Sequence, residues 1–273
     1  MAKKALNEMS FLDHLEELRW LLVRSSAAIV IMGIVSYFFA DYIFSDLIFG
    51  PTDPSFITYR FFCEASHYLG FADSICITEL NFIIQNTQME GQVNIFVWVC
   101  ITAGFILAFP YILWELWKFI SPALYEKEKK NAKLFIFVAS ILFFLGVLFG
   151  YYVIVPMSLN FLATFSISSV VKNQFSIDSY VSMVKTAVIA CGLYFELPII
   201  IYFLTKLGLV GPNFLRKYRK YAVVIILIIA AIVTPPDVVS QITVAVPMMI
   251  IYEGCIWISA VVEKNKKKDE QTS

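Results

Sequence analysis

The sequence is dominated by long apolar runs, and two of them are almost free of charge. Residues 93–117 contain a single charged side chain, Glu115, and residues 134–171 contain none. Hydrophobic residues make up 59% of the chain and charged residues 15%, whereas soluble domains are roughly half apolar and a quarter charged. An apolar helix of about 20 residues is long enough to cross a bilayer. The chain is therefore predicted to be an all-α polytopic membrane protein.

The apolar runs predict six transmembrane helices in one membrane domain, residues 1–262. They cover about residues 21–44, 93–117, 134–155, 181–205, 221–234 and 239–262. The third is expected to end at Pro156, because proline removes a helix hydrogen bond. The remaining residues, 263–273, are highly charged and are expected to form a disordered cytoplasmic tail.

The basic residues orient these spans. All but three of the 21 Lys and Arg residues fall on one side of the membrane when the flanks of the spans are counted alternately. The exceptions are Arg60, Lys172 and Lys185, and Lys185 lies inside the fourth span. Because short basic segments stay in the cytoplasm, both termini are predicted to be cytoplasmic.

The fifth and sixth helices are expected to be short. A helix over residues 221–234 extends about 21 Å, whereas the hydrocarbon core is about 30 Å thick. The bilayer must therefore thin there, or the Pro235-Pro236 turn must lie below the far surface. The sixth helix starts from that turn, so Glu253 is expected near the cytoplasmic surface.

The long periplasmic loop, residues 45–92, is expected to fold as a cap of short elements. It contains Cys63 and Cys76 on the oxidising side of the membrane. A disulfide between them is plausible and would contribute roughly 3 kcal/mol, although two free thiols remain the alternative. The other three cysteines lie in apolar runs and are expected to pack as small hydrophobic residues.

The N-terminal segment predicts an amphipathic helix. Apolar residues recur at helical spacing at Phe11, Leu15, Leu18 and Leu22, while acidic residues occupy other faces. Such a helix is expected to lie on the cytoplasmic surface and to run into the first span.

No pattern in the chain predicts an enzyme, a metal site or a cofactor. The two histidines, His14 and His67, are predicted on opposite sides of the membrane. A glycine-rich phosphate loop followed by Lys and Ser or Thr is missing, which argues against an ATP-driven machine.

Carboxylates are the informative candidates. Glu196 lies deep in the fourth span, just before Pro198, which is expected to kink the helix. An ionisable group at that depth indicates function by default. Lys185 shares its helix face and could line the same polar groove, although a structural, protonated or hydrogen-bonded Glu196 is the alternative.

A second group of carboxylates lies at the cytoplasmic surface: Glu16, Glu17, Glu126 and Glu128. Each alone is most simply a solvated charge. Together they could form an acidic patch, and two carboxylates on separate elements would suit a ligand with two adjacent arginines, because guanidinium binds carboxylate in a two-pronged geometry.

Four motifs resemble the TatC family, the signal-peptide receptors of twin-arginine protein export. They are His14-Leu15-Glu16-Glu17-Leu18-Arg19, Phe119-Ile120-Ser121-Pro122-Ala123-Leu124-Tyr125 with Glu128, Phe195-Glu196-Leu197-Pro198 and Thr234-Pro235-Pro236-Asp237-Val238-Val239-Ser240-Gln241. The resemblance spans nearly the whole chain.

The resemblance implies a receptor in the bacterial cytoplasmic (inner) membrane that binds twin-arginine signal peptides. Its implied partners are TatA-type and TatB-type single-span subunits, folded cargo proteins, the lipid bilayer and further copies of itself, but no nucleic acid. The implied energy source is the proton motive force.

The resemblance also assigns residues. Glu17 and Glu128 would form the twin-arginine site, with Arg19, Phe119, Glu16 and Lys130 beside it. Glu196, Asp237 and Gln241 would belong to a polar groove in the membrane. Three features depart from the family pattern: Lys130 where arginine is common, Glu115 where the family has an uncharged polar residue, and a longer loop with two cysteines.

Two other functions remain open from the sequence. A proton-coupled small-solute transporter could use Glu196 and Lys185, although such folds usually show internal repeats and none is visible. The second open function is that of a purely structural scaffold in a membrane complex.

Overall fold

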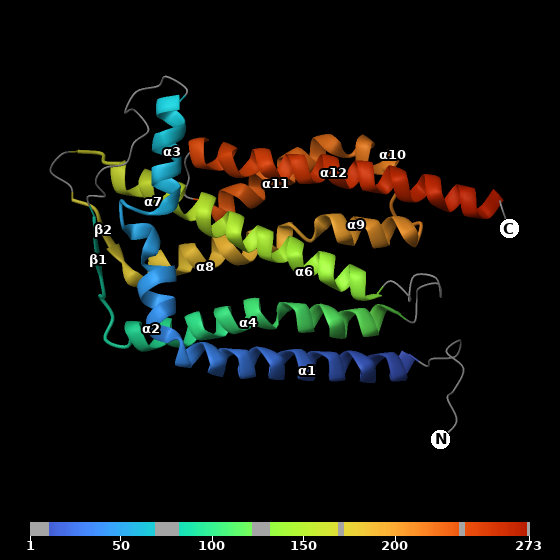
Figure 1. Cartoon of the computed structure of the whole chain (residues 1–273), viewed down its shortest axis with the longest axis horizontal. Helices are drawn as coiled ribbons and strands as arrows, with labels where there is room; N and C mark the ends of the chain where they lie inside the picture. The colour runs from blue at the N-terminus through green and yellow to red at the C-terminus, as the bar shows by residue number, and fades with distance from the viewer. Residues whose placement is uncertain (1–10, 69–81, 122–131, 169–171, 235–237, 272–273) are drawn as a thin grey trace. The chain divides into compact units, whose positions relative to one another are not determined.

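The computed structural model describes residues 11–68, 82–121, 132–168, 172–234 and 238–271 (Figure 1). The chain divides into two compact units. The first consists of residues 1–40 and 97–141, and the second of residues 41–96 and 142–273.

The first unit contains α1 (Phe11–Phe38), most of α4 (Gly91–Ile120) and the beginning of α6 (Ala132–Phe149). Helices α1 and α4 approach closely at two glycines: a Cβ atom placed on Gly104 would lie 2.6 Å from the backbone nitrogen of Gly33 and 2.6 Å from the carbonyl oxygen of Ile29. Small residues allow such contact between membrane helices, where dispersion and not the hydrophobic effect drives packing.

The second unit holds the remaining helices and a small sheet. Its elements are α2 (Ala40–Tyr42), a π-turn (Ile43–Ile48), a 3-10 turn (Gly50–Thr52), α3 (Ile57–Tyr68), β1 (Ile83–Gln85), a second π-turn (Gly150–Ile154), α7 (Val155–Thr164), β2 (Gln174–Ser176), α8 (Ile177–Tyr194), α9 (Leu197–Lys206), α10 (Pro212–Lys217), α11 (Arg219–Val233) and α12 (Val238–Gln271). The strands pair in parallel, with Ile83 opposite Gln174. This two-stranded sheet is a small departure from the all-α prediction.

Polar contacts fasten α8 and α9 to α12. The Tyr194 hydroxyl donates to the Met248 carbonyl at 2.9 Å. The hydroxyls of Thr205 and Ser259, both buried, lie 2.9 Å apart. A hydroxyl pair in an apolar core keeps both polar groups satisfied, so the register between α9 and α12 is specific.

Five helices of the described residues are long and apolar enough to cross a membrane: His14–Phe38, Gly91–Ile120, Lys133–Thr164, Ile177–Lys206 and Gln241–Lys266. The chain is therefore a multi-pass membrane protein. Helix α11 has 15 residues and is short, as expected.

The predicted end of the third span at Pro156 is wrong. The helix passes through a π-turn and continues as α7 to Thr164, with Pro156 in the first turn of α7. Proline frees the carbonyl four residues earlier, which belongs to Tyr152. The Thr58 hydroxyl of α3 donates to that carbonyl at 2.6 Å, so a tertiary contact replaces the missing helix bond.

The predictions of a short sixth helix and a disordered tail are also wrong. Helix α12 has 34 residues and includes the tail as far as Gln271. Lysine and glutamate are strong helix formers, and extending an existing helix needs no new nucleus.

The N-terminal amphipathic segment is not a separate surface helix. It is the first part of α1, which continues without a break from Phe11 to Phe38. Neither glycine nor proline occurs between Phe11 and Met32, so the sequence offers no point at which the helix would turn.

The loop over residues 45–92 folds into short elements, as expected, where the structure describes it. Tyr59 of α3 is almost completely buried and donates to the Pro51 carbonyl at 2.9 Å. Cys63 is disulfide-bonded, but Cys76 lies outside the described residues, so its pairing with Cys63 stays a prediction. Cys100, Cys191 and Cys255 are free and buried.

Candidate functional site

The start of α1 and the end of α4 meet in the first unit. The rings of His14 and Phe119 are stacked, with centroids 4.4 Å apart. Two of the motifs singled out in the sequence, more than a hundred residues apart in the chain, are therefore in direct contact. Trp117 and Phe135 stack at 5.5 Å, so the helix ends on either side of residues 122–131 are also held together.

Among the side chains that the structure describes in the first turns of α1, Glu16, Glu17 and Arg19 are charged, and all three are exposed. Glu16 and Arg19 form an ion pair one turn apart at 3.7 Å, with about two thirds of each side chain exposed. The Arg19 guanidinium also lies over the Trp20 ring, 5.5 Å from its centroid. Glu17 pairs with no other described residue. Glu17 is thus the carboxylate of this turn that remains available to a ligand.

Glu128 and Lys130 lie outside the described residues, as does Asp237. The structure therefore places Glu16, Glu17, Arg19 and Phe119 at one end of the first unit and leaves the predicted partnership of Glu17 and Glu128 as a prediction.

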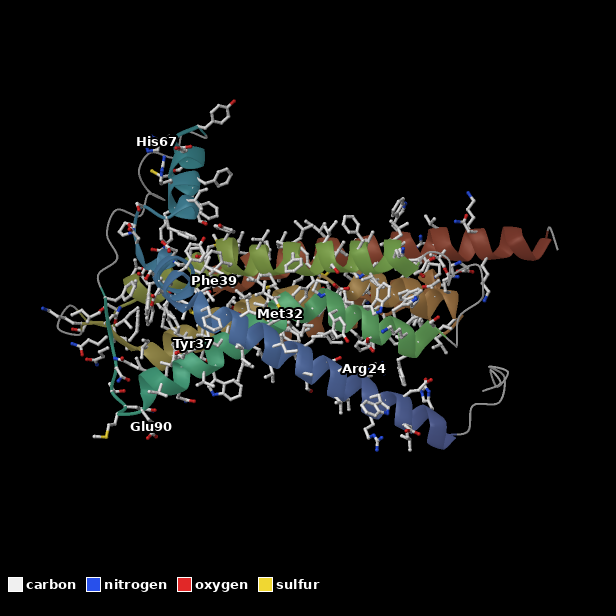
Figure 2. The ribbon with its side chains drawn as sticks, turned by 60° about the horizontal axis from the view of Figure 1, so that its bottom comes forward. Arg24, Met32, Tyr37, Phe39, His67 and Glu90 are labelled. Carbon is white, nitrogen blue, oxygen red and sulfur yellow. The ribbon has the colours of Figure 1, made fainter. Side chains whose placement is uncertain are left out.

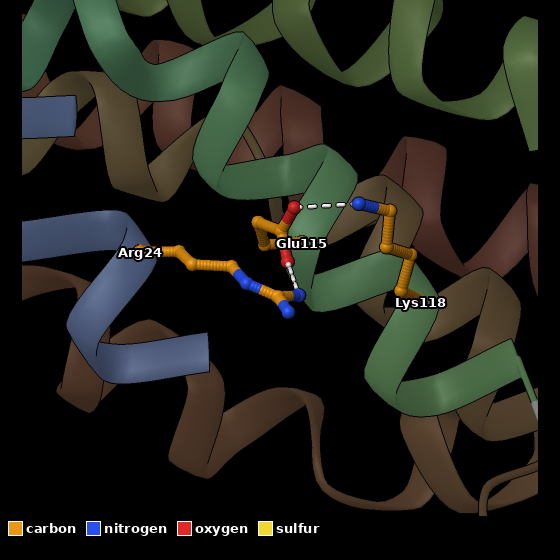
Figure 3. Close-up of polar contacts among 3 residues, drawn as sticks. All are labelled: Arg24, Glu115 and Lys118. Carbon is orange, nitrogen blue, oxygen red and sulfur yellow. Dashed lines mark hydrogen bonds and ion pairs between the residues drawn. The ribbon is translucent and has the colours of Figure 1, made fainter. Parts of the chain in front are cut away.

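A cluster of three charges joins α1 to α4, and sequence reasoning missed it (Figure 3). Glu115 is only 3% exposed. Arg24 of α1 donates to its Oε2 at 3.2 Å, and Lys118 donates to its Oε1 at 2.6 Å. Both cations are about half exposed.

The cluster explains why Glu115 is tolerated in an apolar run. A buried carboxylate is costly unless it is paired and hydrogen-bonded, and here each oxygen has a cationic donor. The signals were present in the sequence: Glu115 is the single charge of its run, and Arg24 stands near the start of the first. Only the three-dimensional arrangement shows that they are partners.

Glu196 lies at the break between α8 and α9 in the second unit, directly before α9 begins, and Pro198 occupies the first turn of α9. The expected kink is therefore present. Glu196 is 6% exposed, and its Oε1 is buried without a hydrogen-bond partner among the described residues. An unpartnered buried carboxyl is unusual, which agrees with a functional role.

Lys185 and Gln241 have other neighbours. Asp178, at the start of α8, acts electrostatically on Lys185. The Gln241 side chain donates to the Leu227 carbonyl at 3.1 Å and so ties the start of α12 to α11. Neither contact involves Glu196, and the polar groove predicted for Glu196, Gln241 and Asp237 stays a prediction.

Within the described residues, no group of three or more His, Cys, Asp or Glu side chains could hold a metal ion. What the site offers instead is exposed charge beside stacked aromatic rings, at the ends of two helices.

Comparisons with known proteins give a consistent result. The family profile described as Sec-independent protein translocase protein (TatC) matches residues 13–247. The chain is 44% identical to the TatC protein of Blattabacterium sp. subsp. Periplaneta americana over 97% of this chain and all of that one. It is 34% identical to TatCy of Bacillus subtilis over 98% and 95% of the two chains.

Solved structures agree with the sequence relatives. A crystal structure of the twin arginine translocase receptor TatC superposes with a TM-score of 0.72 at 31% identity, and the match covers 91% of this chain and 99% of that one. From the profile, the relatives and the structure together, the chain belongs to the TatC family of Sec-independent protein translocase proteins.

Proposed function

We propose that the protein is the signal-peptide receptor subunit of a twin-arginine translocase in the bacterial cytoplasmic membrane. TatC proteins are translocase subunits and not enzymes. The observation that carries the proposal is the contact between His14 and Phe119, because it joins the two motifs on which a paired-arginine site depends.

The exposed charges favour Glu17 as one of the two arginine-binding carboxylates. Glu115 is already neutralised by Arg24 and Lys118, and Glu16 is paired with Arg19. Glu17 has no such partner among the described residues, so it can accept a guanidinium without breaking an internal contact. Glu128 supplies the second carboxylate, and each charge-assisted hydrogen bond contributes roughly 1.5–3 kcal/mol.

The first unit then holds the arginine pair while the apolar part of the signal peptide inserts along the membrane helices near Glu196. TatA-type and TatB-type single-span subunits join the receptor, several copies assemble, and the proton motive force drives passage of the folded cargo.

In this proposal α11 counts as a sixth span, and both termini are cytoplasmic. Its 15 residues extend about 22 Å, so the bilayer thins beside it. The placement of Arg19, Arg24 and Lys118 at one end of the first unit supports the orientation, since basic residues mark the cytoplasmic side.

The family assignment favours this function over a proton-coupled small-solute transporter that would use Glu196 and Lys185. It also favours a receptor over a passive scaffold, because the superposed crystal structure is that of a receptor.

Charge reversal tests the proposal. A twin-arginine peptide carrying a photo-crosslinker next to its arginines should label the wild-type protein in membranes and should fail to label Glu17→Lys or Glu128→Lys. The matched control is Glu64→Lys, which reverses an exposed carboxylate on α3 and should leave labelling unchanged. Normal labelling and export in Glu17→Lys would contradict the assignment.

A further inference from the structure

Helix α3 has two very different faces. Its inner face is buried: Thr58, Tyr59 and Ser66 are 7%, 2% and 3% exposed. Its outer face carries three large apolar side chains, because Ile57, Phe61 and Tyr68 are 64%, 65% and 93% exposed.

These three side chains lie on one side of α3, and the exposed carboxylate Glu64 lies on the same side between Phe61 and Tyr68. Residues separated by four and seven positions stand above one another on a helix, so Ile57, Phe61 and Tyr68 fall on a single narrow arc. We call them the α3 stripe. Isolated exposed apolar residues are ordinary. Three large apolar side chains aligned on one helix instead indicate a surface that is covered by lipid or by another protein.

The direction of α3 indicates what covers it. In Figures 1 and 2, α3 runs across the axis of α12 and leaves the second unit sideways, near the end at which α12 begins. Helix α12 contains a candidate span. A helix that crosses the direction of a span at its end lies in the plane of the membrane surface.

Contacts of the inner face fix the position of α3 along the direction of the spans. Thr58 donates to Tyr152, and Tyr59 lies within 3.4 Å of the Pro156 carbonyl. Both acceptors belong to the far part of the span Lys133–Thr164. Tyr42 and Tyr152 of the same unit are also exposed, 59% and 38%, and exposed tyrosines mark the level of the lipid headgroups.

The polar residues of α3 complete an interfacial pattern. Arg60 lies beside the stripe and is exposed, where its guanidinium can bind lipid phosphate. His67, near the end of α3, is also exposed (Figure 2). The exposed side of α3 thus combines large apolar side chains with charged and polar ones, as in helices that lie at a membrane surface.

We propose that α3 is an interfacial helix whose stripe, Ile57, Phe61 and Tyr68, lies among the phospholipid headgroups beside the spans. With the orientation proposed above, this is the outer leaflet. Because α3 is bonded through Thr58 and Tyr59 to the span Lys133–Thr164, it sets the depth of the second unit in the bilayer. The proposal depends only on the protein being a membrane protein and not on its receptor role.

The test uses the full-length protein in vesicles of phosphatidylethanolamine and phosphatidylglycerol. Benzoylphenylalanine replaces Phe61, Tyr68 or His67 one at a time, the sample is irradiated, and adducts are identified by mass. Phospholipid adducts should be several-fold more abundant at positions 61 and 68 than at position 67. All three side chains point outward from the helix, so the substitutions should leave the gel-filtration profile unchanged.

Three outcomes would overturn the proposal. Equal lipid labelling at positions 61, 67 and 68 would show that the stripe contacts lipid no more than the rest of α3 does. Crosslinks between two copies of the chain at position 61 would show that the stripe is a protein interface. Absence of any adduct at positions 61 and 68, with a normal profile, would place the stripe in water.

A second measurement gives an independent readout. A spin label attached through cysteine at position 61 should be accessible to oxygen and protected from a water-soluble nickel complex, and a label at position 67 should show the opposite. The cysteines Cys100, Cys191 and Cys255 are buried, so the unsubstituted protein provides the labelling blank. Strong access of nickel to position 61 would refute the interfacial location.

Discussion

The ion pair between Arg24 and Glu115 should couple α1 to α4 more strongly than its exposed counterpart elsewhere in the chain. The comparison pair is Arg219 and Glu253, which lie 2.8 Å apart and are 49% and 45% exposed. Glu115, in contrast, is only 3% exposed, and its distance to Arg24 is 3.2 Å. The two pairs have the same chemistry but differ in burial.

The magnitude follows from burial. At about 3.2 Å and an effective dielectric constant of about 20, the gross attraction is about 5 kcal/mol. Desolvation of Glu115 offsets much of it, and Arg24 is half in contact with solvent. The net coupling should therefore be close to that of a charge-assisted hydrogen bond, about 2 kcal/mol. For Arg219 and Glu253 the expected coupling is about 0.5 kcal/mol, as for exposed pairs.

A double-mutant cycle measures this difference. Arg24→Met, Glu115→Met and the double variant are unfolded by SDS in mixed micelles, and the coupling free energy is taken from the cycle. The same cycle with Arg219→Met and Glu253→Met is the control. In Arg24→Met the contact between Lys118 and Glu115 remains, so the carboxylate is never left without a cation. A coupling for Arg24 and Glu115 no larger than that of the control pair would refute the argument from burial.

Two further predictions concern packing and covalent structure. Gly104→Ala should destabilise the protein by about 2 kcal/mol, because the added Cβ would meet the backbone of Gly33; Gly254→Ala, which adds a Cβ where nothing lies within 4 Å, should be neutral or stabilise by up to about 1 kcal/mol. Equal effects in the same unfolding assay would contradict the close approach. Cys63 should pair with Cys76, so alkylation of the denatured protein without reductant should modify three thiols and with reductant all five; two additional modified thiols in the unreduced sample would exclude the bridge.

Properties that depend on local sequence were predictable. The long spans followed from hydropathy, and the shortness of α11 followed from the distance between Lys220 and Pro235. The break at Glu196 followed from Pro198, because proline acts on its own helix whatever surrounds it. The ends of the candidate site, at His14 and Phe119, were likewise identified from their motifs.

Properties that depend on contacts between distant parts of the chain were not predictable from the sequence. Like Pro198, Pro156 lies within a long apolar run. The helix nevertheless continues past Pro156, because Thr58 from α3 donates a hydrogen bond to the Tyr152 carbonyl that the proline leaves free. The charged tail was expected to be disordered, but it extends a helix that the preceding span had already nucleated.

The sequence by itself thus determined a membrane protein with a cluster of charge at helix ends, since burial in lipid requires long apolar helices that bond their own backbone. Only the tertiary structure decided that Arg24 and Lys118 neutralise Glu115 and leave Glu17 exposed. It also decided that the apolar stripe of α3 faces outward. The physical reason is the same in both cases: charge pairing and burial are properties of atoms within a few ångströms of one another, and the chain brings those atoms together from positions far apart in sequence.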